Sequence, residues 1–149
     1  MAQQATQQTT INAPPEQCFE VAVDFERYPE WARDVKEAEV VERDSEGRAV
    51  EVAFRAAGLG RSARYRLHYD YDAAPGQLSW ELVDSDLLRR LDGVYEFTAG
   101  ADDTTLVTYH LTVDVKVPLP GFVKRRAEKM IMSTALESLR EAVERDVTA

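Results

Sequence analysis

Between residues 37 and 115 the chain repeats one pattern, in which apolar and polar side chains alternate between short turn-forming segments. In the clearest example, 63–71, one set of alternate positions holds Tyr65, Leu67, Tyr69 and Tyr71, and the other holds Arg64, Arg66, His68 and Asp70. Successive side chains of a strand point to opposite faces, so such a segment has one apolar face. We expect strands at 6–11, 37–42, 49–57, 63–71, 78–83, 94–99 and 107–115. Strands joined by turns predict an antiparallel sheet with one covered face.

Helical segments flank these strands. Pro14 and Pro15 suit the first turn of a helix, and Pro29 disfavours helical geometry at Tyr28, so we expect the first helix to end or kink there. A second helix is expected at 122–145, where apolar residues recur every four positions: Val123, Ala127, Ile131, Ala135, Leu139 and Val143. At 1.5 Å per residue it is about 36 Å long, enough to cross the sheet. The predicted fold class is α+β.

Composition restricts the partners and the location. The 149 residues fit one domain, which we place at 5–149 after a polar tail at 1–4. The net charge of -9 makes nucleic acid an unsuitable partner, because binding to its phosphates depends on Lys and Arg. With Cys18, His68 and His110 as the only cysteine and histidines, no metal site is expected. The sequence shows neither a secretion signal nor the roughly 20 apolar residues of a membrane span, so we expect a cytoplasmic protein.

The apolar faces of the expected strands are rich in aromatic residues, which are candidates for ligand contact: Phe54, Tyr65, Tyr69, Trp80, Tyr95, Phe97 and Tyr109. They either fill a packed core or line a cavity, and the tyrosines favour a cavity because a buried hydroxyl needs a hydrogen-bond partner. Tyr28 and Trp31 either fasten the first helix to the core or contact a ligand at the cavity mouth. Ile131 and Ala135 are the candidates on the C-terminal helix.

Several short segments carry a resemblance to a known family: Ala13-Pro14, Asp24-Phe25, Tyr28–Trp31, Val35–Ala38, Gly93–Phe97 and Val117–Phe122. Together they resemble the polyketide cyclase/dehydrase and lipid-transport superfamily, also called START-like or Bet v 1-like. The chain is most similar to short cyclase/dehydrase-like proteins of actinobacteria. The resemblance implies a helix-grip fold, in which a curved antiparallel sheet wraps a long C-terminal helix and an apolar cavity lies between them.

What the resemblance implies about function leaves three alternatives. The first is binding or transport of a hydrophobic small molecule, such as a lipid, a quinone or a polyketide-like compound, with no cofactor. The second is a polyketide aromatase/cyclase or dehydratase, with Tyr65, Tyr69 or Tyr95 as proton donor. The third is a protein-interaction module with a filled core.

The sequence departs from the cyclase pattern at one important point. The resemblance implies that such an enzyme uses an arginine inside the cavity to stabilise an enolate. Arg64 and Arg66 lie in the comparable strand, but alternation puts them with His68 on the face that we expect to be solvated. His110 is expected on an outer face for the same reason.

A basic cluster begins the C-terminal helix and contains Lys124, Arg125, Arg126 and Lys129. Charge runs are usually solvated, so one interpretation is a face paired with the protein's own carboxylates. The other is transient contact with anionic membrane headgroups, or with an acidic ligand near the cavity entrance.

Overall fold

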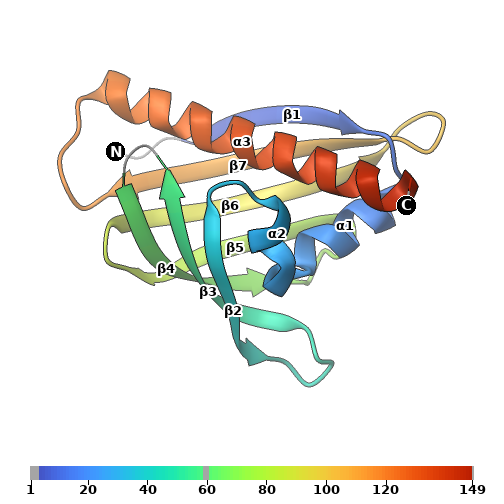
Figure 1. The fold of residues 1–149 in the computed structure, drawn as a ribbon, viewed down its shortest axis with the longest axis horizontal. Coiled ribbons are helices and arrows are strands. Elements are labelled where there is room, and N and C mark those ends of the chain that lie inside the picture. Colours follow the sequence, from blue (N-terminus) through green and yellow to red (C-terminus); the bar gives the residue numbers. More distant parts are fainter. Residues whose placement is uncertain (1–3, 59–60, 149) are drawn as a thin grey trace.

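The computed structural model describes residues 4–58 and 61–148, so the predicted tail at 1–4 falls mostly outside the described residues. One antiparallel seven-stranded sheet has the order β1-β7-β6-β5-β4-β3-β2 (Figure 1). Its strands are β1 (Ala5–Ile11), β2 (Val35–Arg43), β3 (Ala49–Gly58), β4 (Arg61–Asp70), β5 (Gln77–Ser85), β6 (Leu88–Ala99) and β7 (Thr105–Val115). The expected antiparallel sheet is confirmed.

The N-terminal helical segment breaks earlier than predicted. Helix α1 (Pro15–Val23) ends at Asp24, a 3-10 turn η1 (Phe25–Arg27) follows, and α2 (Tyr28–Trp31) begins where we expected the break. Pro29 lies in the first turn of α2, where a missing N–H breaks no helical hydrogen bond. The proline therefore starts a helix here instead of ending one.

The long helix α3 (Gly121–Thr148) covers the inner face of the sheet, along β1 and β7 and against α1 (Figure 1). The contacts of Gln7 show which face of the sheet α3 covers. Gln7 lies directly opposite Tyr109 in the β1–β7 register, so the two side chains are on the same face. Its amide donates to the Lys129 backbone carbonyl at 3.1 Å, and its oxygen accepts from the Ser133 hydroxyl at 3.0 Å. The tyrosine-bearing face of β7 and α3 are thus on the same side.

The buried side of α3 differs from the predicted stripe. The apolar residues with almost no exposed surface are Met132, Leu136, Leu139, Ala142 and Val143. Val123, which was expected to face the core, is exposed, and Ile131 and Ala135 are half-buried. A constant four-residue spacing drifts by about 40° per step around a helix of 3.6 residues per turn. The first members of the predicted series therefore rotate away from the sheet.

Strand β6 begins six residues earlier than predicted, and β5 extends to Ser85. Asp84, which follows the predicted strand at 78–83, belongs to β5, where it pairs with Arg66. The register shifts between Arg66 and Leu67, so that one extra residue of β5, Val83, has no partner in β4. This irregularity lies in β5, and the alternation of β4 continues past it: Leu67 and Tyr69 are buried, while His68 and Asp70 are exposed.

No helix in the described part of the chain is long and apolar enough to cross a membrane.

Candidate functional site

The aromatic side chains of the inner face form one connected series. From α2 it runs Trp31–Tyr28, Tyr28–Phe54 and Phe54–Tyr65, with ring centroids 4.6, 5.8 and 5.4 Å apart. Phe25 joins this group to Tyr69 at 4.4 Å, and Tyr69 lies 5.9 Å from Trp80. Beyond Trp80 the series reaches Tyr95, Tyr109 and Phe97. The structure thus brings all nine aromatic candidates together.

Phe25 was not among the candidates, although it lies at the centre of this series. Its only signal in the sequence was its place on the apolar side of the first helical segment, which is also the signal of an ordinary core residue. Its contacts with Tyr28, Phe54 and Tyr69 come from three elements, and only the tertiary fold joins them.

Four tyrosine hydroxyls in the series have no partner among the residues that the structure describes. Within residues 4–58 and 61–148, no hydrogen bond is made by the hydroxyls of Tyr65, Tyr69, Tyr95 or Tyr109. These oxygens are also not among the fully buried polar atoms that lack a partner, which in the same residues are Glu128 Oε2 and Ser138 Oγ. Each hydroxyl therefore reaches accessible space, even though Tyr69 and Tyr109 are only 5% exposed as whole residues.

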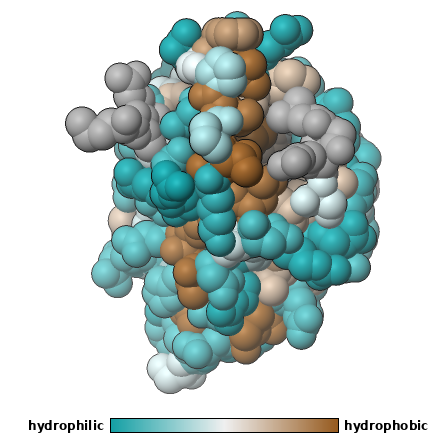
Figure 2. Space-filling model, turned by 90° about the vertical axis from the view of Figure 1, so that its left-hand side faces the viewer, coloured by the Kyte–Doolittle hydropathy of each residue, from teal (hydrophilic) through white to brown (hydrophobic). Residues whose placement is uncertain are grey.

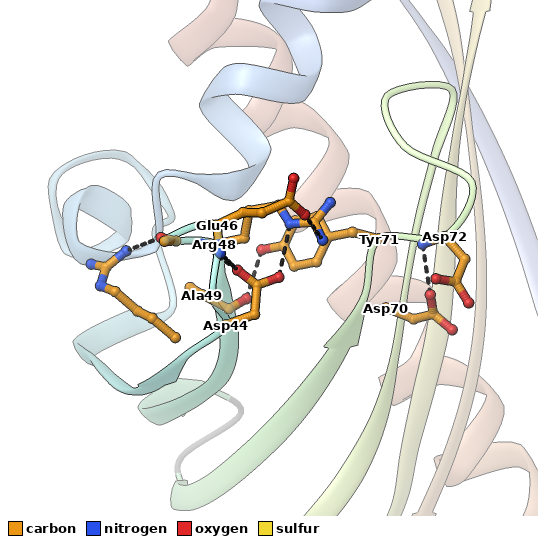
Figure 3. A network of polar contacts seen from close by, with 9 residues as sticks. Asp44, Glu46, Arg48, Ala49, Asp70, Tyr71 and Asp72 are labelled. Carbon is orange, nitrogen blue, oxygen red and sulfur yellow. Dashed lines mark hydrogen bonds and ion pairs between the residues drawn. The ribbon is translucent and has the colours of Figure 1, made fainter.

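Two other tyrosines use their hydroxyls to hold the fold together. Tyr28 donates to the backbone carbonyl of Ala22, which fixes α2 against α1. Tyr71 donates to the carbonyl of Ala49 at 2.6 Å, and the Arg48 guanidinium lies 5.0 Å from its ring centroid (Figure 3). Asp44 holds that arginine at 2.9 Å in the turn between β2 and β3. These two hydroxyls are not available to a ligand.

Burial moves the pKa of the inner tyrosines still further above neutral pH. It raises the pKa of Tyr65 and Tyr95, and it places the pKa of Tyr69 and Tyr109 well above the usual value of 10.0. Burial also raises the pKa of Tyr71, to about 12, with Arg48 opposing the shift. At neutral pH the unpartnered phenols are therefore neutral and able to donate a hydrogen bond.

Two grooves approach the aromatic series from different sides. One, of about 640 Å³, has Phe54 and Tyr65 in its wall together with Ser85. The other, of about 440 Å³, lies between α1, α2 and the end of α3, and Trp31 belongs to its lining. The chain of rings from Trp31 to Tyr65 therefore connects the two grooves.

The ionic side chains of β4 and β7 lie on the outer face of the sheet, as alternation predicted, although Arg64, Arg66 and Asp84 also line the groove that contains Phe54 and Tyr65. Arg66 pairs with Asp84 at 2.6 Å and with Glu51 at 3.0 Å on the outer face of the sheet. His110 contacts Glu96 and Thr6, each at 2.9 Å. Within the described residues, no group of three or more His, Cys, Asp or Glu side chains could hold a metal ion.

The family model for polyketide cyclase / dehydrase and lipid transport matches residues 2–144. No curated protein matches the chain. Among solved structures, a START superfamily protein from Mycobacterium smegmatis is 22% identical with a TM-score of 0.90, and the match covers 95% of this chain and 97% of that one. A protein from Thermus thermophilus is 23% identical over 98% of this chain and 97% of that one, with a TM-score of 0.78.

The Zhui aromatase/cyclase from Streptomyces sp. R1128 is 13% identical, with a TM-score of 0.84 over 99% of this chain and 96% of that one. At these identities the likenesses show the fold, and the expected helix-grip architecture is confirmed. Because the family model covers nearly the whole sequence, the chain belongs to the polyketide cyclase/dehydrase and lipid-transport family.

Proposed function

We propose that this protein binds a hydrophobic small molecule with hydrogen-bond acceptors, in the space between the inner face of the sheet and α3. The observation that supports this most directly is the set of unpartnered hydroxyls on Tyr65, Tyr69, Tyr95 and Tyr109. A hydroxyl removed from bulk water is costly unless something accepts its hydrogen bond. Carbonyl or hydroxyl oxygens of a lipid, quinone or polyketide-like ligand would serve as that acceptor.

The surroundings of these hydroxyls favour an uncharged ligand. The neighbouring groups are aromatic rings, and the phenols are neutral at physiological pH, since the usual pKa of 10.0 is already well above it and burial raises it further. A flat apolar molecule gains contact area against the rings, while its oxygens fix its orientation. The accessible hydroxyls also argue against an interaction module with a filled core.

Binding is favoured over polyketide cyclisation by the positions of the β4 arginines. A cyclase acting on a poly-β-ketone needs a cationic or strongly donating group near the developing enolate. Arg66 lines the groove that contains Tyr65, but its guanidinium is engaged by Asp84 and Glu51 on the outer face of the sheet and does not point toward the inner tyrosines. The tyrosines could supply protons, but the described part of β4 provides no inward-facing arginine to accompany them.

The test combines ligand identification with matched tyrosine variants. Native mass spectrometry of freshly purified protein, followed by solvent extraction, would identify a retained molecule. Menadione, a neutral quinone, and oleic acid, an anionic lipid, are then titrated while the fluorescence of Trp31 and Trp80 is followed. We expect menadione to bind, and Tyr69→Phe or Tyr109→Phe to weaken its binding by about fivefold each, the value of one neutral hydrogen bond.

Tyr71→Phe is the matched control, because it removes a hydroxyl that already has a protein partner. We expect it to lower stability by about 1 kcal/mol and to leave menadione affinity unchanged. The proposal fails if no molecule is retained and neither probe binds the wild-type protein. Equal weakening of binding by all three variants would also contradict it, since the effect would then not come from the unpartnered hydroxyls.

A further inference from the structure

Large apolar side chains are exposed where α3 begins. Phe122 is 69% exposed, and the other exposed members of this region are Val117, Leu119, Val123 and Met130. Figure 2 looks onto this end of the molecule and shows hydrophobic residues in a column flanked by hydrophilic ones. These five residues lie next to the exposed basic residues in the first turns of α3. We call the region that they form together the end surface. An exposed aromatic residue in such a group indicates a contact surface more than an isolated exposed residue does.

The same segment has the opposite charge to the molecule as a whole. Residues 116–130 carry one carboxylate, that of the buried Glu128, in a chain of net charge -9. Their cationic residues are Lys116, Lys124, Arg125, Arg126 and Lys129. Lys124 pairs with Asp114 at 3.6 Å, whereas the exposed Arg125, Arg126 and Lys129 make no ion pair with any described residue. Pairing with the protein's own carboxylates thus accounts for one member of the basic cluster.

Apolar and basic side chains share one side of the helix. Phe122, Arg126 and Met130 follow each other at four-residue intervals, which places them in one row along an α-helix. Val123 lies beside this row, and all four residues are exposed. An aromatic residue flanked by Lys and Arg is the arrangement by which a helix lies in a membrane interface, with rings among the acyl chains and cations at the headgroups.

We propose that the end surface docks onto an anionic lipid bilayer. Charge complementarity selects this partner, because exposed cations that pair with no described carboxylate attract a negative surface in an otherwise acidic protein. The apolar residues add contact that a soluble anion would not supply. Nucleic acid offers phosphates but no apolar phase for Phe122 and Leu119. The surface of α3 that would touch the bilayer is opposite the buried Met132 and Leu139.

Docking at this end would also bring one groove to the membrane. Lys116 bonds to the turn between β5 and β6 through its N–H to the Leu87 carbonyl at 2.9 Å and through its Nζ to the Ser85 carbonyl at 2.7 Å. Ser85 lines the groove that contains Phe54 and Tyr65. A hydrophobic ligand could then pass between bilayer and groove, and this consequence, unlike the docking itself, rests on the proposed function.

Vesicle co-sedimentation tests the docking with the full-length protein. We expect binding to vesicles of phosphatidylcholine mixed with phosphatidylglycerol, weaker binding as salt is raised, and no binding to phosphatidylcholine alone. Equal binding to both vesicle types, or none to either, would overturn the proposal. Neither result would affect ligand binding by the tyrosine-lined space, which is measured without vesicles.

Variants then locate the contact. Arg126→Gln with Lys129→Gln should weaken binding by about fivefold per removed charge, and Phe122→Ser should also reduce it. Arg33→Gln with Arg43→Gln changes net charge equally at exposed sites elsewhere, and Val41→Ser removes an apolar residue that is 48% exposed on β2. These controls should bind like the wild type. If they lose as much binding as the end-surface variants, with circular dichroism showing every variant folded, the assignment to this surface is wrong.

Discussion

Chemically identical side chains have different roles in this protein because their partners differ. Tyr71 and Tyr28 donate to backbone carbonyls and hold elements together, whereas Tyr69 and Tyr109 donate to nothing within the described residues. Alternation predicted which face Tyr69 and Tyr109 occupy. It could not predict their missing partners, because those depend on how α1, α2 and α3 close over the sheet.

At Gly93 a neighbouring side chain decides which residue type fits. Gly93 lies opposite Trp80 in the β5–β6 register, and a Cβ added there would collide with the indole and come within 3.0 Å of the His110 carbonyl oxygen. We expect Gly93→Ala to lower the free energy of unfolding by about 1–3 kcal/mol, the usual cost of overpacking a buried site. It should also shift the tryptophan emission of the protein, to which Trp80 contributes together with Trp31.

Urea denaturation followed by fluorescence measures both effects. Gly76→Ala is the control, since a Cβ there has no atom closer than 3.8 Å. A stable Gly93→Ala protein with an unchanged emission spectrum would show that the indole does not pack on this glycine.

At the scale of elements, periodicity correctly predicted that α3 is a helix. For its first turns, however, it predicted the wrong residues to be buried. The predicted series of apolar residues drifts around the helix, so Val123 is exposed at its beginning while Leu139 and Val143 are enclosed at its end. The α1 break was also misplaced, because proline is compatible with both the end and the first turn of a helix.

The difference between the predicted and the observed buried side of α3 can be tested directly. Met132→Ala should lower the free energy of unfolding by about 2–5 kcal/mol, because it leaves a cavity in the core. Val123→Ala should change it by less than about 0.5 kcal/mol, since the side chain is already exposed. Thermal or urea denaturation of both variants provides the comparison. If Val123→Ala lowered the free energy of unfolding more than Met132→Ala, the buried side of α3 would be the one predicted from the sequence.

At the scale of the whole molecule, the enclosed phenols couple global stability to alkaline pH. Burial raises the pKa of Tyr28, Tyr65, Tyr69, Tyr95 and Tyr109 above the usual value of 10.0. Below about pH 10 the phenols are protonated in both states, and their contribution to stability is complete. Above it the unfolded chain releases protons that the folded protein keeps, so the free energy of unfolding falls as pH rises.

We therefore expect urea denaturation to show a progressive loss of stability above about pH 10, at most about 1.4 kcal/mol per pH unit for each buried phenol. The double variant Tyr69→Phe/Tyr109→Phe should lose stability less steeply over the same range. Lysines and arginines titrate alike in both proteins, so the difference in slope reports the two phenols. Identical slopes would mean that these phenols ionise in the folded state as readily as in the unfolded one.

The sequence alone determined the sheet, its inner and outer faces and the long final helix, because periodicity and turn residues are local properties of the chain. The family came from the resemblance of short motifs and from the family model that matches residues 2–144. The sequence also determined that Arg66 and His68 face away from the tyrosines, because side-chain direction alternates strictly along β4. Only the tertiary structure decided how Phe25 joins the aromatic groups, which hydroxyls lack a partner within residues 4–58 and 61–148, and that Phe122 is exposed beside cations that make no ion pair with these residues. These properties arise from contacts between residues far apart in the chain, and local patterns cannot encode which distant groups meet.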